Sequence, residues 1–103
     1  MDEVLIIGAG PAGIAAAMQL KRYGLDPHIV ECSAIGGLLH NANLVENYPG
    51  FPGGIPGPKL VSLLKQHVRD LHLRLTYGEV TRLDIVDGVF RAKTSVAVNQ
   101  QDI

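Results

Sequence analysis

The chain has 103 residues, a formal net charge of −1 and 47% apolar residues, which suits one globular domain and is too short for two. Its nine lysines and arginines form no basic stripe and no apolar run is long enough to cross a bilayer, so neither nucleic acid nor a membrane is an expected partner. The single cysteine, Cys32, excludes a disulfide framework and fits a reducing compartment, which predicts a cytoplasmic protein.

The first part of the chain has the pattern of a strand, a helix and a second strand. Val4–Ile7 is an unbroken apolar run, typical of a strand that is covered on both faces. A helix is expected from Pro11, with Gly24 ending it, and one of its faces collects Gly13, Ala16, Ala17 and Leu20. Because His28–Glu31 predicts a second strand, residues 4–31 form a βαβ unit.

The middle of the chain predicts a loop, a second helix and a third strand. Residues 49–58 contain eight glycines or prolines, which excludes both helix and strand. A surface helix is expected over 58–70 with Gly57 as its N-cap, and its apolar stripe consists of Leu60, Leu64, Val68 and Leu71. Alternation of leucines with polar residues over 71–76 predicts a strand near a sheet edge.

The last third predicts a β-hairpin. Glu79–Val86 and Val89–Thr94 are rich in β-forming residues, and Asp87-Gly88 between them suits a type I′ turn. A further strand is expected near Val96–Val98. The fold class is therefore α/β: a Rossmann-like, three-layer dinucleotide-binding domain with parallel strands in the order 3-2-1, one helix in each crossover and an antiparallel hairpin layer.

A glycine motif, Gly8-Ala9-Gly10-Pro11-Ala12-Gly13, lies between the first strand and the first helix. In such a motif Gly8 allows the tight turn, Gly10 lets the backbone approach a pyrophosphate, and Gly13 lets the helix sit close to the sheet. The N–H groups and dipole of the helix start then favour the phosphates. A glycine-rich turn in an unrelated α/β domain is the alternative interpretation.

Glu31, at the end of the second strand, is the expected partner of this motif. An acidic residue there accepts hydrogen bonds from the ribose hydroxyls of an adenosine group. Both FAD and NAD carry that group, so the motif and Glu31 leave a flavoprotein and an NAD-binding dehydrogenase domain open. About 26 residues separate the second strand from the next helix, which is consistent with a segment that wraps a ligand.

Several of these segments together resemble one known family. Residues 4–31, Gly36-Gly37, Val45–Pro52 and the following Gly-Ile-x-Gly-Pro are similar to the N-terminal FAD-binding region of the thioredoxin reductase-like family, within the pyridine nucleotide-disulfide oxidoreductases. The resemblance implies that Gly36, Gly37 and Asn47 lie along the flavin and that Val80 contacts adenine through its backbone. The sequence departs from the family at Leu38, where glutamine is usual.

The resemblance also implies what lies around the chain. Residues 1–103 would be a single, truncated FAD-binding domain of an NAD(P)H-dependent flavoprotein oxidoreductase that forms a homodimer. NAD(P)H would bind to a downstream domain, which in this family carries the redox cysteines. The resemblance assigns no catalytic and no metal-binding residue to this chain. A non-catalytic nucleotide-binding module is a further alternative.

Four further side chains each allow two interpretations. Cys32 is either a reactive thiol or a small packed residue, and packing is the more common case. His40 lies near the expected flavin or is an ordinary loop histidine. Tyr48 and Phe51 either pack on a ligand ring or anchor their own loop.

Overall fold

The computed structural model describes residues 4–95. In chain order the elements are β1 (Leu5–Ile7), α1 (Pro11–Arg22), β2 (His28–Glu31), the 3-10 helix η1 (Gly37–Asn41), α2 (Gly57–Asp70), β3 (Arg74–Tyr77), β4 (Glu79–Val86) and β5 (Val89–Ser95). The strand expected near Val96–Val98 lies outside the described residues.

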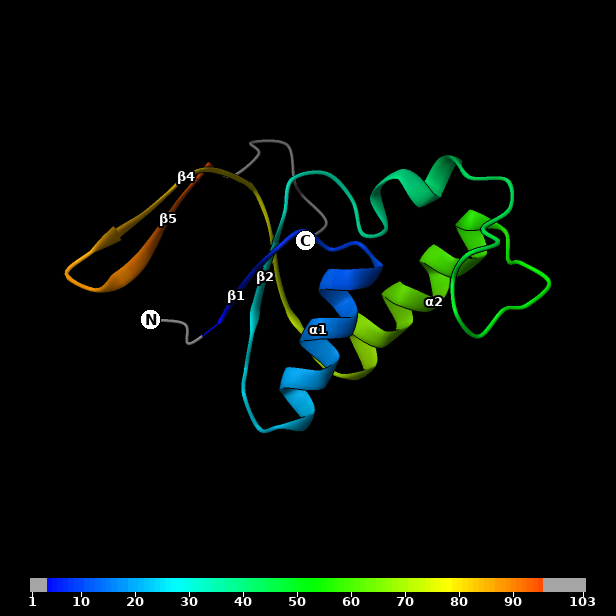
Figure 1. The fold of residues 1–103 in the computed structure, drawn as a ribbon, viewed down its shortest axis with the longest axis horizontal. Coiled ribbons are helices and arrows are strands. Elements are labelled where there is room, and N and C mark those ends of the chain that lie inside the picture. The colour runs from blue at the N-terminus through cyan, green and yellow to red at the C-terminus, as the bar shows by residue number, and fades with distance from the viewer. Residues whose placement is uncertain (1–3, 96–103) are drawn as a thin grey trace.

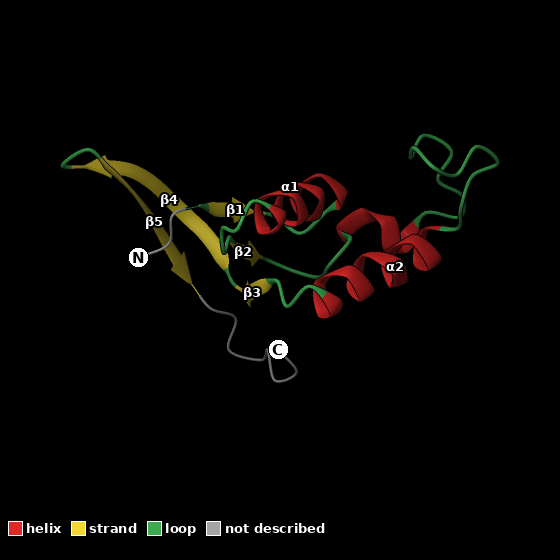
Figure 2. Ribbon diagram, turned by 90° about the horizontal axis from the view of Figure 1, so that it is seen from below, coloured by secondary structure: helices red, strands yellow, loops and turns green. Residues whose placement is uncertain are grey.

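The first three strands form a parallel sheet in the order β1-β2-β3, which confirms the expected order. Ile6 is paired with Ile29, and Ile29 with Leu75. Each crossover contains one α-helix, and both helices lie on the same side of the sheet (Figure 1). Strands β4 and β5 form a separate antiparallel sheet on the other side, so the α/β class and its three layers are confirmed (Figure 2).

Helix α1 starts and ends as its sequence predicts. Pro11 occupies the first turn, where its missing N–H costs nothing. Gly24 follows the helix with φ +86°, and its N–H donates to the Lys21 carbonyl at 3.0 Å. Ile14 and Ala17 are fully buried, whereas Ala16 is exposed. The expected packing face was therefore wrong at Ala16, because the helix is rotated to bury its larger apolar side chain, Ile14.

Helix α2 begins one residue earlier than predicted, with Pro56 as N-cap and Gly57 inside the first turn. A Cβ on Gly57 would approach the Ala42 carbonyl oxygen to 2.5 Å, so glycine is needed for close packing and not for capping. The apolar stripe is confirmed. Leu60 and Leu64 are 2% and 4% exposed, and Val68 and Leu71 pack partly against the same core.

The third strand is shorter than the leucine alternation predicts. Leu71 caps α2, His72 takes the left-handed conformation with φ +51°, and β3 starts only at Arg74. The Leu73 N–H donates to the Val68 carbonyl at 3.0 Å, and its side chain is buried. Leu71 and Leu73 alternate because both turn into the core as the helix ends, not because they share a strand.

The hairpin is confirmed, and its surroundings correct one expectation about β1. Asp87 and Gly88 have φ values of +53° and +78°, as a type I′ turn requires. The hairpin projects away from the parallel sheet (Figure 2), and β1 lies at the edge of that sheet. Leu5 and Ile7 are consequently 36% and 56% exposed, so β1 is not covered on both faces by the described residues.

Candidate functional site

The glycine-rich turn joins the carboxyl end of β1 to α1. Gly8 has φ +107°, which a side chain would strain, and its N–H donates to the Val30 carbonyl at 2.8 Å. A Cβ on Gly13 would run into the Gly8 carbonyl, so this glycine brings the helix against the turn. A Cβ on Gly10 would meet no atom within 4 Å. The turn therefore packs tightly at Gly13 and is open at Gly10.

The start of α1 faces this open side. Gly10 is its N-cap, and no side chain caps the helix. The amides of the first turn, which include those of Ala12 and Gly13, have no helical acceptor. Backbone N–H groups in this position, together with the helix dipole, favour an anion.

Glu31 ends β2 directly beside the turn, and its side chain is held by backbone groups. Its Oε1 accepts a hydrogen bond from the Ala9 N–H at 2.8 Å, and its Oε2 accepts one from the Ser33 N–H at 2.8 Å. The residue is only 8% exposed. Each carboxylate oxygen retains a second lone pair with which it can accept a hydrogen bond from a ligand.

Gly36 and Gly37 meet the turn at the carbonyl group of Ala9, whereas Glu31 meets it at the Ala9 N–H. Both have positive φ, at +89° and +51°, and the Gly36 N–H donates to the Ala9 carbonyl at 2.9 Å. A Cβ on Gly36 would approach the Val61 side chain of α2 to 2.5 Å. Glycine is thus required here by conformation and by space.

An open groove of about 540 Å³ collects six of the predicted residues: Gly10, Pro11, Gly36, Gly37, Leu38 and Asn47. Asn47 reaches it because Val45 and Ile55 form an antiparallel bridge that holds the intervening loop. Leu38, on η1, is 90% exposed and adds an apolar rim where a glutamine is usual in the family that the sequence resembles.

Val80 lies at the Glu31 end of the site and not in the groove itself. The Gly78 N–H donates to the Glu31 carbonyl at 2.8 Å, which places the start of β4 beside the end of β2. The site therefore runs from Val80 and Glu31, past the glycine-rich turn, to the groove. This line follows the carboxyl ends of parallel strands, where α/β sheets bind ligands.

Some residues that build the site carried no signal in the sequence. Ala9 is fully buried and hydrogen-bonded through both its N–H and its carbonyl, although it is only a variable position of the motif. Ser33 contributes a backbone N–H, which any residue except proline could supply.

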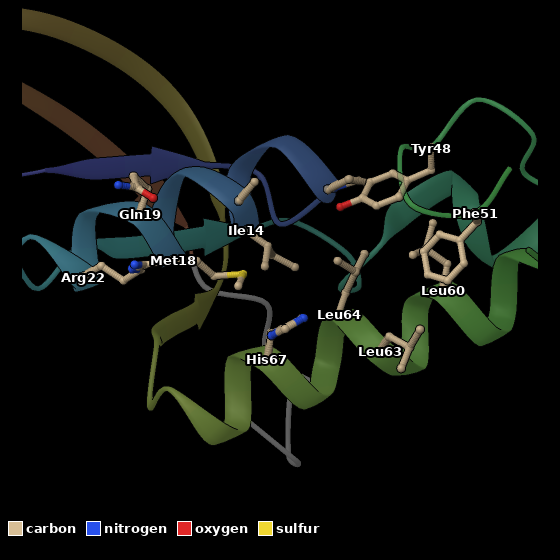
Figure 3. A pocket seen from close by; sticks show the side chains of 12 residues that line it. Ile14, Met18, Gln19, Arg22, Tyr48, Phe51, Leu60, Leu63, Leu64 and His67 are labelled. Carbon is tan, nitrogen blue, oxygen red and sulfur yellow. The ribbon is translucent and has the colours of Figure 1, made fainter.

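A second hollow, of about 340 Å³, lies between α1 and α2 (Figure 3). Tyr48 and Phe51 line it, with ring centroids 6.1 Å apart, and both pack partly buried against the core. Neither ring lines the groove that holds Asn47. The structure therefore favours the interpretation that this aromatic pair anchors its own loop over the interpretation that it packs on a ligand ring.

Cys32 and His40 take positions that do not bring them into the groove. Cys32 is exposed, so the expectation of a packed thiol was wrong: the strand ends at the buried Glu31, and Cys32 is the first residue beyond it. The His40 Nε2 lies 2.9 Å from the Ile35 carbonyl oxygen, which ties η1 to the preceding segment. Within residues 4–95 there is no cluster of three or more metal-ligating side chains, and no helix is suited to span a membrane.

Comparisons with known proteins agree with a dinucleotide-binding fold. The model of one family, pyridine nucleotide-disulphide oxidoreductase, matches residues 2–103. The chain belongs to this family. A thioredoxin reductase from Mycoplasma pneumoniae is 44% identical over 82 residues, which cover 80% of this chain and 26% of that protein.

Several solved structures that resemble this chain are thioredoxin reductases as well. The Lactococcus lactis thioredoxin reductase has a TM-score of 0.82 at 33% identity over 91% of this chain and 31% of its own. A ferredoxin-flavin thioredoxin reductase from Clostridium acetobutylicum has a TM-score of 0.81 at 28% identity, over 93% of this chain and 33% of its own. This member of the pyridine nucleotide-disulphide oxidoreductases thus spans about a quarter to a third of these relatives, and it corresponds to the FAD-binding portion of a thioredoxin reductase-like flavoprotein.

Proposed function

We propose that this chain binds FAD within a thioredoxin reductase-like, NAD(P)H-dependent oxidoreductase. The observation that supports the proposal best is the groove, in which the open side of Gly10 meets Gly36, Gly37 and Asn47. An FAD pyrophosphate fits at Gly10, Pro11, Ala12 and the uncapped start of α1, because this is a place with free N–H groups and no Cβ. The residues present are therefore suited to the cofactor.

The two ends of the site suit the two ends of FAD. Glu31 has lone pairs for ribose hydroxyls, and Val80 has backbone groups for adenine beside it. Gly36, Gly37 and Asn47 line the groove at the flavin end, where Leu38 offers an apolar contact in place of an amide. When bound, the flavin supplies the hydride chemistry, and these residues bind and orient it.

The electron donor, the oligomeric state and the location of the protein are further parts of this proposal. The family name refers to a pyridine nucleotide, whereas the name of the Clostridium neighbour refers to ferredoxin and flavin. We assign NAD(P)H as donor, bound by a domain outside residues 1–103, and place the protein as a homodimer in the cytoplasm. The shares of 26% and 31% of the relatives' lengths support a longer flavoprotein of which this chain is one part.

Calorimetric titration of the purified chain with FAD, NAD and ADP tests the proposal. We expect FAD to bind more tightly than NAD, because the groove beyond Gly10 offers contacts to the flavin. ADP and NAD have no flavin to make these contacts. ADP reports the adenosine end alone. Equal affinities for FAD and ADP would contradict a flavin site, and tighter binding of NAD would instead support the dehydrogenase alternative.

A further inference from the structure

Glu31 does more in this structure than offer oxygens to a ribose. We propose that it is a positioning residue, which fixes the glycine-rich turn before any ligand binds and, through Ala9, couples the two ends of the site. The inference rests on the proposed function for the identity of the ligand alone. The contacts that carry it lie within the chain.

The Glu31 carboxylate is buried, and both of its oxygens accept a backbone hydrogen bond. No other charged side chain among residues 4–95 is buried. Each of its oxygens accepts an N–H at 2.8 Å, one from Ala9 in the turn and one from Ser33 after β2. Hydrogen bonds to an ionised acceptor are stronger than neutral ones, and a buried charge is tolerated only when it is paired in this way. The carboxylate and the turn therefore hold each other in place.

Ala9 links Glu31 to Gly36, which lies at the flavin end of the site. Its N–H is bound by Glu31, and its carbonyl accepts the Gly36 N–H at 2.9 Å. Ala9 is fully buried, so water cannot replace either partner without a movement of the turn. Gly36 in turn stands at the groove, against the Val61 side chain. A chain of two hydrogen bonds thus runs from Glu31 to the flavin end.

Removal of the carboxylate should therefore weaken the hydrogen bond of the Gly36 amide. In a Glu31→Ala chain the amides of buried Ala9 and exposed Ser33 lose their acceptor, and the turn relaxes to solvate the Ala9 amide. The Ala9 carbonyl then shifts, and the Gly36 amide loses its acceptor. A residue that only contacts the ribose would have no such effect in the absence of a ligand.

Amide hydrogen exchange by NMR on the ligand-free chain measures this coupling. We expect the Ala9, Ser33 and Gly36 amides of Glu31→Ala to exchange about tenfold faster or more than in the wild type, while the core amide of Leu64 keeps its rate. Glu31→Gln keeps one acceptor oxygen and the shape of the side chain, so it should restore part of the protection. Asp70→Ala removes an exposed carboxylate at the end of α2 and is the matched control.

Two outcomes of this experiment would overturn the inference. One is an unchanged Gly36 rate in Glu31→Ala, which would limit the role of Glu31 to its direct contacts. The other concerns the case in which the alanine variant unfolds and Leu64 exchanges faster as well. The isosteric Glu31→Gln then decides: a faster-exchanging Ala9 amide beside an unchanged Gly36 amide in that variant would refute the coupling.

Ligand binding separates positioning from ribose contact. FMN has the flavin and one phosphate but no adenosine, so it cannot use a ribose acceptor at Glu31. We expect Glu31→Ala to weaken FMN about fivefold or more and FAD about tenfold or more. A loss for FAD alone would show a ribose acceptor without positioning. If the complete flavoprotein binds neither flavin, the proposed function fails, while the exchange rates still decide the role of Glu31.

Discussion

Gly10 and Gly13 differ in what a side chain would meet, although both belong to one motif. A Cβ on Gly13 would run into backbone, whereas a Cβ on Gly10 would enter open space, and its N-cap φ of −79° is one that any residue adopts. A Gly10→Val protein should therefore fold. Its side chain would occupy the place of the pyrophosphate, so we expect it to abolish FAD retention in the complete flavoprotein. Flavin absorbance of the purified protein measures this.

Gly53→Val is the matched control for that experiment. Gly53 also faces open space and has no positive φ, but it lies in the loop before α2 and outside the groove. Its variant should keep the wild-type flavin content. A soluble Gly10→Val protein with as much flavin as the control would refute the assignment of the turn.

Cys32 has the exposure of a reactive thiol but not the partners. It is the single cysteine of the chain, so no resolving cysteine exists within residues 1–103, and it lies beside the adenosine end of the site. We expect Cys32→Ser to leave the turnover of the complete flavoprotein within error of the wild type, measured by NAD(P)H oxidation. A loss of about a hundredfold or more would assign the thiol a redox task.

The position of Glu31 was predictable from the sequence, but its hydrogen-bond partners were not. The spacing from the glycine motif places an acid at the end of β2 whatever the fold does in detail. Its partners are the backbone N–H groups of Ala9 and Ser33, and almost every residue has such a group. A pattern of side chains cannot show which amides turn toward the carboxylate.

Among the elements, those with local signals were predicted best. Pro11 and Gly24 bracket α1, and Asp87-Gly88 sets the hairpin turn, because each depends on the conformations open to a few neighbouring residues. Helix η1 was missed, and β3 was placed too early. Both depend on contacts made in the folded chain: η1 packs against α2, and Leu73 is drawn into the core before the strand begins.

The anchoring of α2 gives a prediction at this scale. Leu60 is 2% exposed and Leu63 is 37% exposed, although both are leucines within one turn of the same helix. Leu60→Ala should lower the free energy of unfolding by about 2–5 kcal/mol, because it removes buried methyl groups and leaves a cavity under the sheet-facing side of α2. Urea denaturation of the complete flavoprotein, followed by circular dichroism, measures the loss.

Leu63→Ala makes the same chemical change in the second hollow, where the leucine already contacts solvent. It should cost less than about 1 kcal/mol. Comparable losses for the two variants would mean that α2 is not oriented by the stripe that contains Leu60.

At the scale of the molecule, apolar surface is exposed in two places that the described residues do not cover. β1 is an edge strand with Leu5 and Ile7 partly open. The hairpin carries Leu83, Ile85 and Phe90 on one face, and these are 55%, 61% and 72% exposed. Its opposite face is charged, with Asp84 held between Arg82 and Arg91 at 3.4 and 3.3 Å. A hairpin with one apolar face is stable only when something packs on that face.

We therefore expect the isolated chain of residues 1–103 to self-associate and to hold FAD poorly. The unpaired edge of β1 and the apolar hairpin face favour contact with further copies. The groove is open on one side, so much of a bound flavin would stay in solvent, and a deficit of even about 4 kcal/mol weakens binding roughly a thousandfold. Sedimentation velocity should show dimers or larger species, and the preparation should be colourless or weakly yellow.

Charge placed on the hairpin face tests the cause of association. Phe90→Lys should shift the sedimentation distribution toward monomer, because it puts a cation on the apolar face beside Ile85. Tyr23→Lys is the control, since Tyr23 is 72% exposed as well but lies at the end of α1, and it should leave association unchanged. A wild-type chain that sediments as a monomer with about one FAD per chain would contradict the prediction. Residues 1–103 would then be a small flavin-binding module that needs no further wall to enclose its ligand.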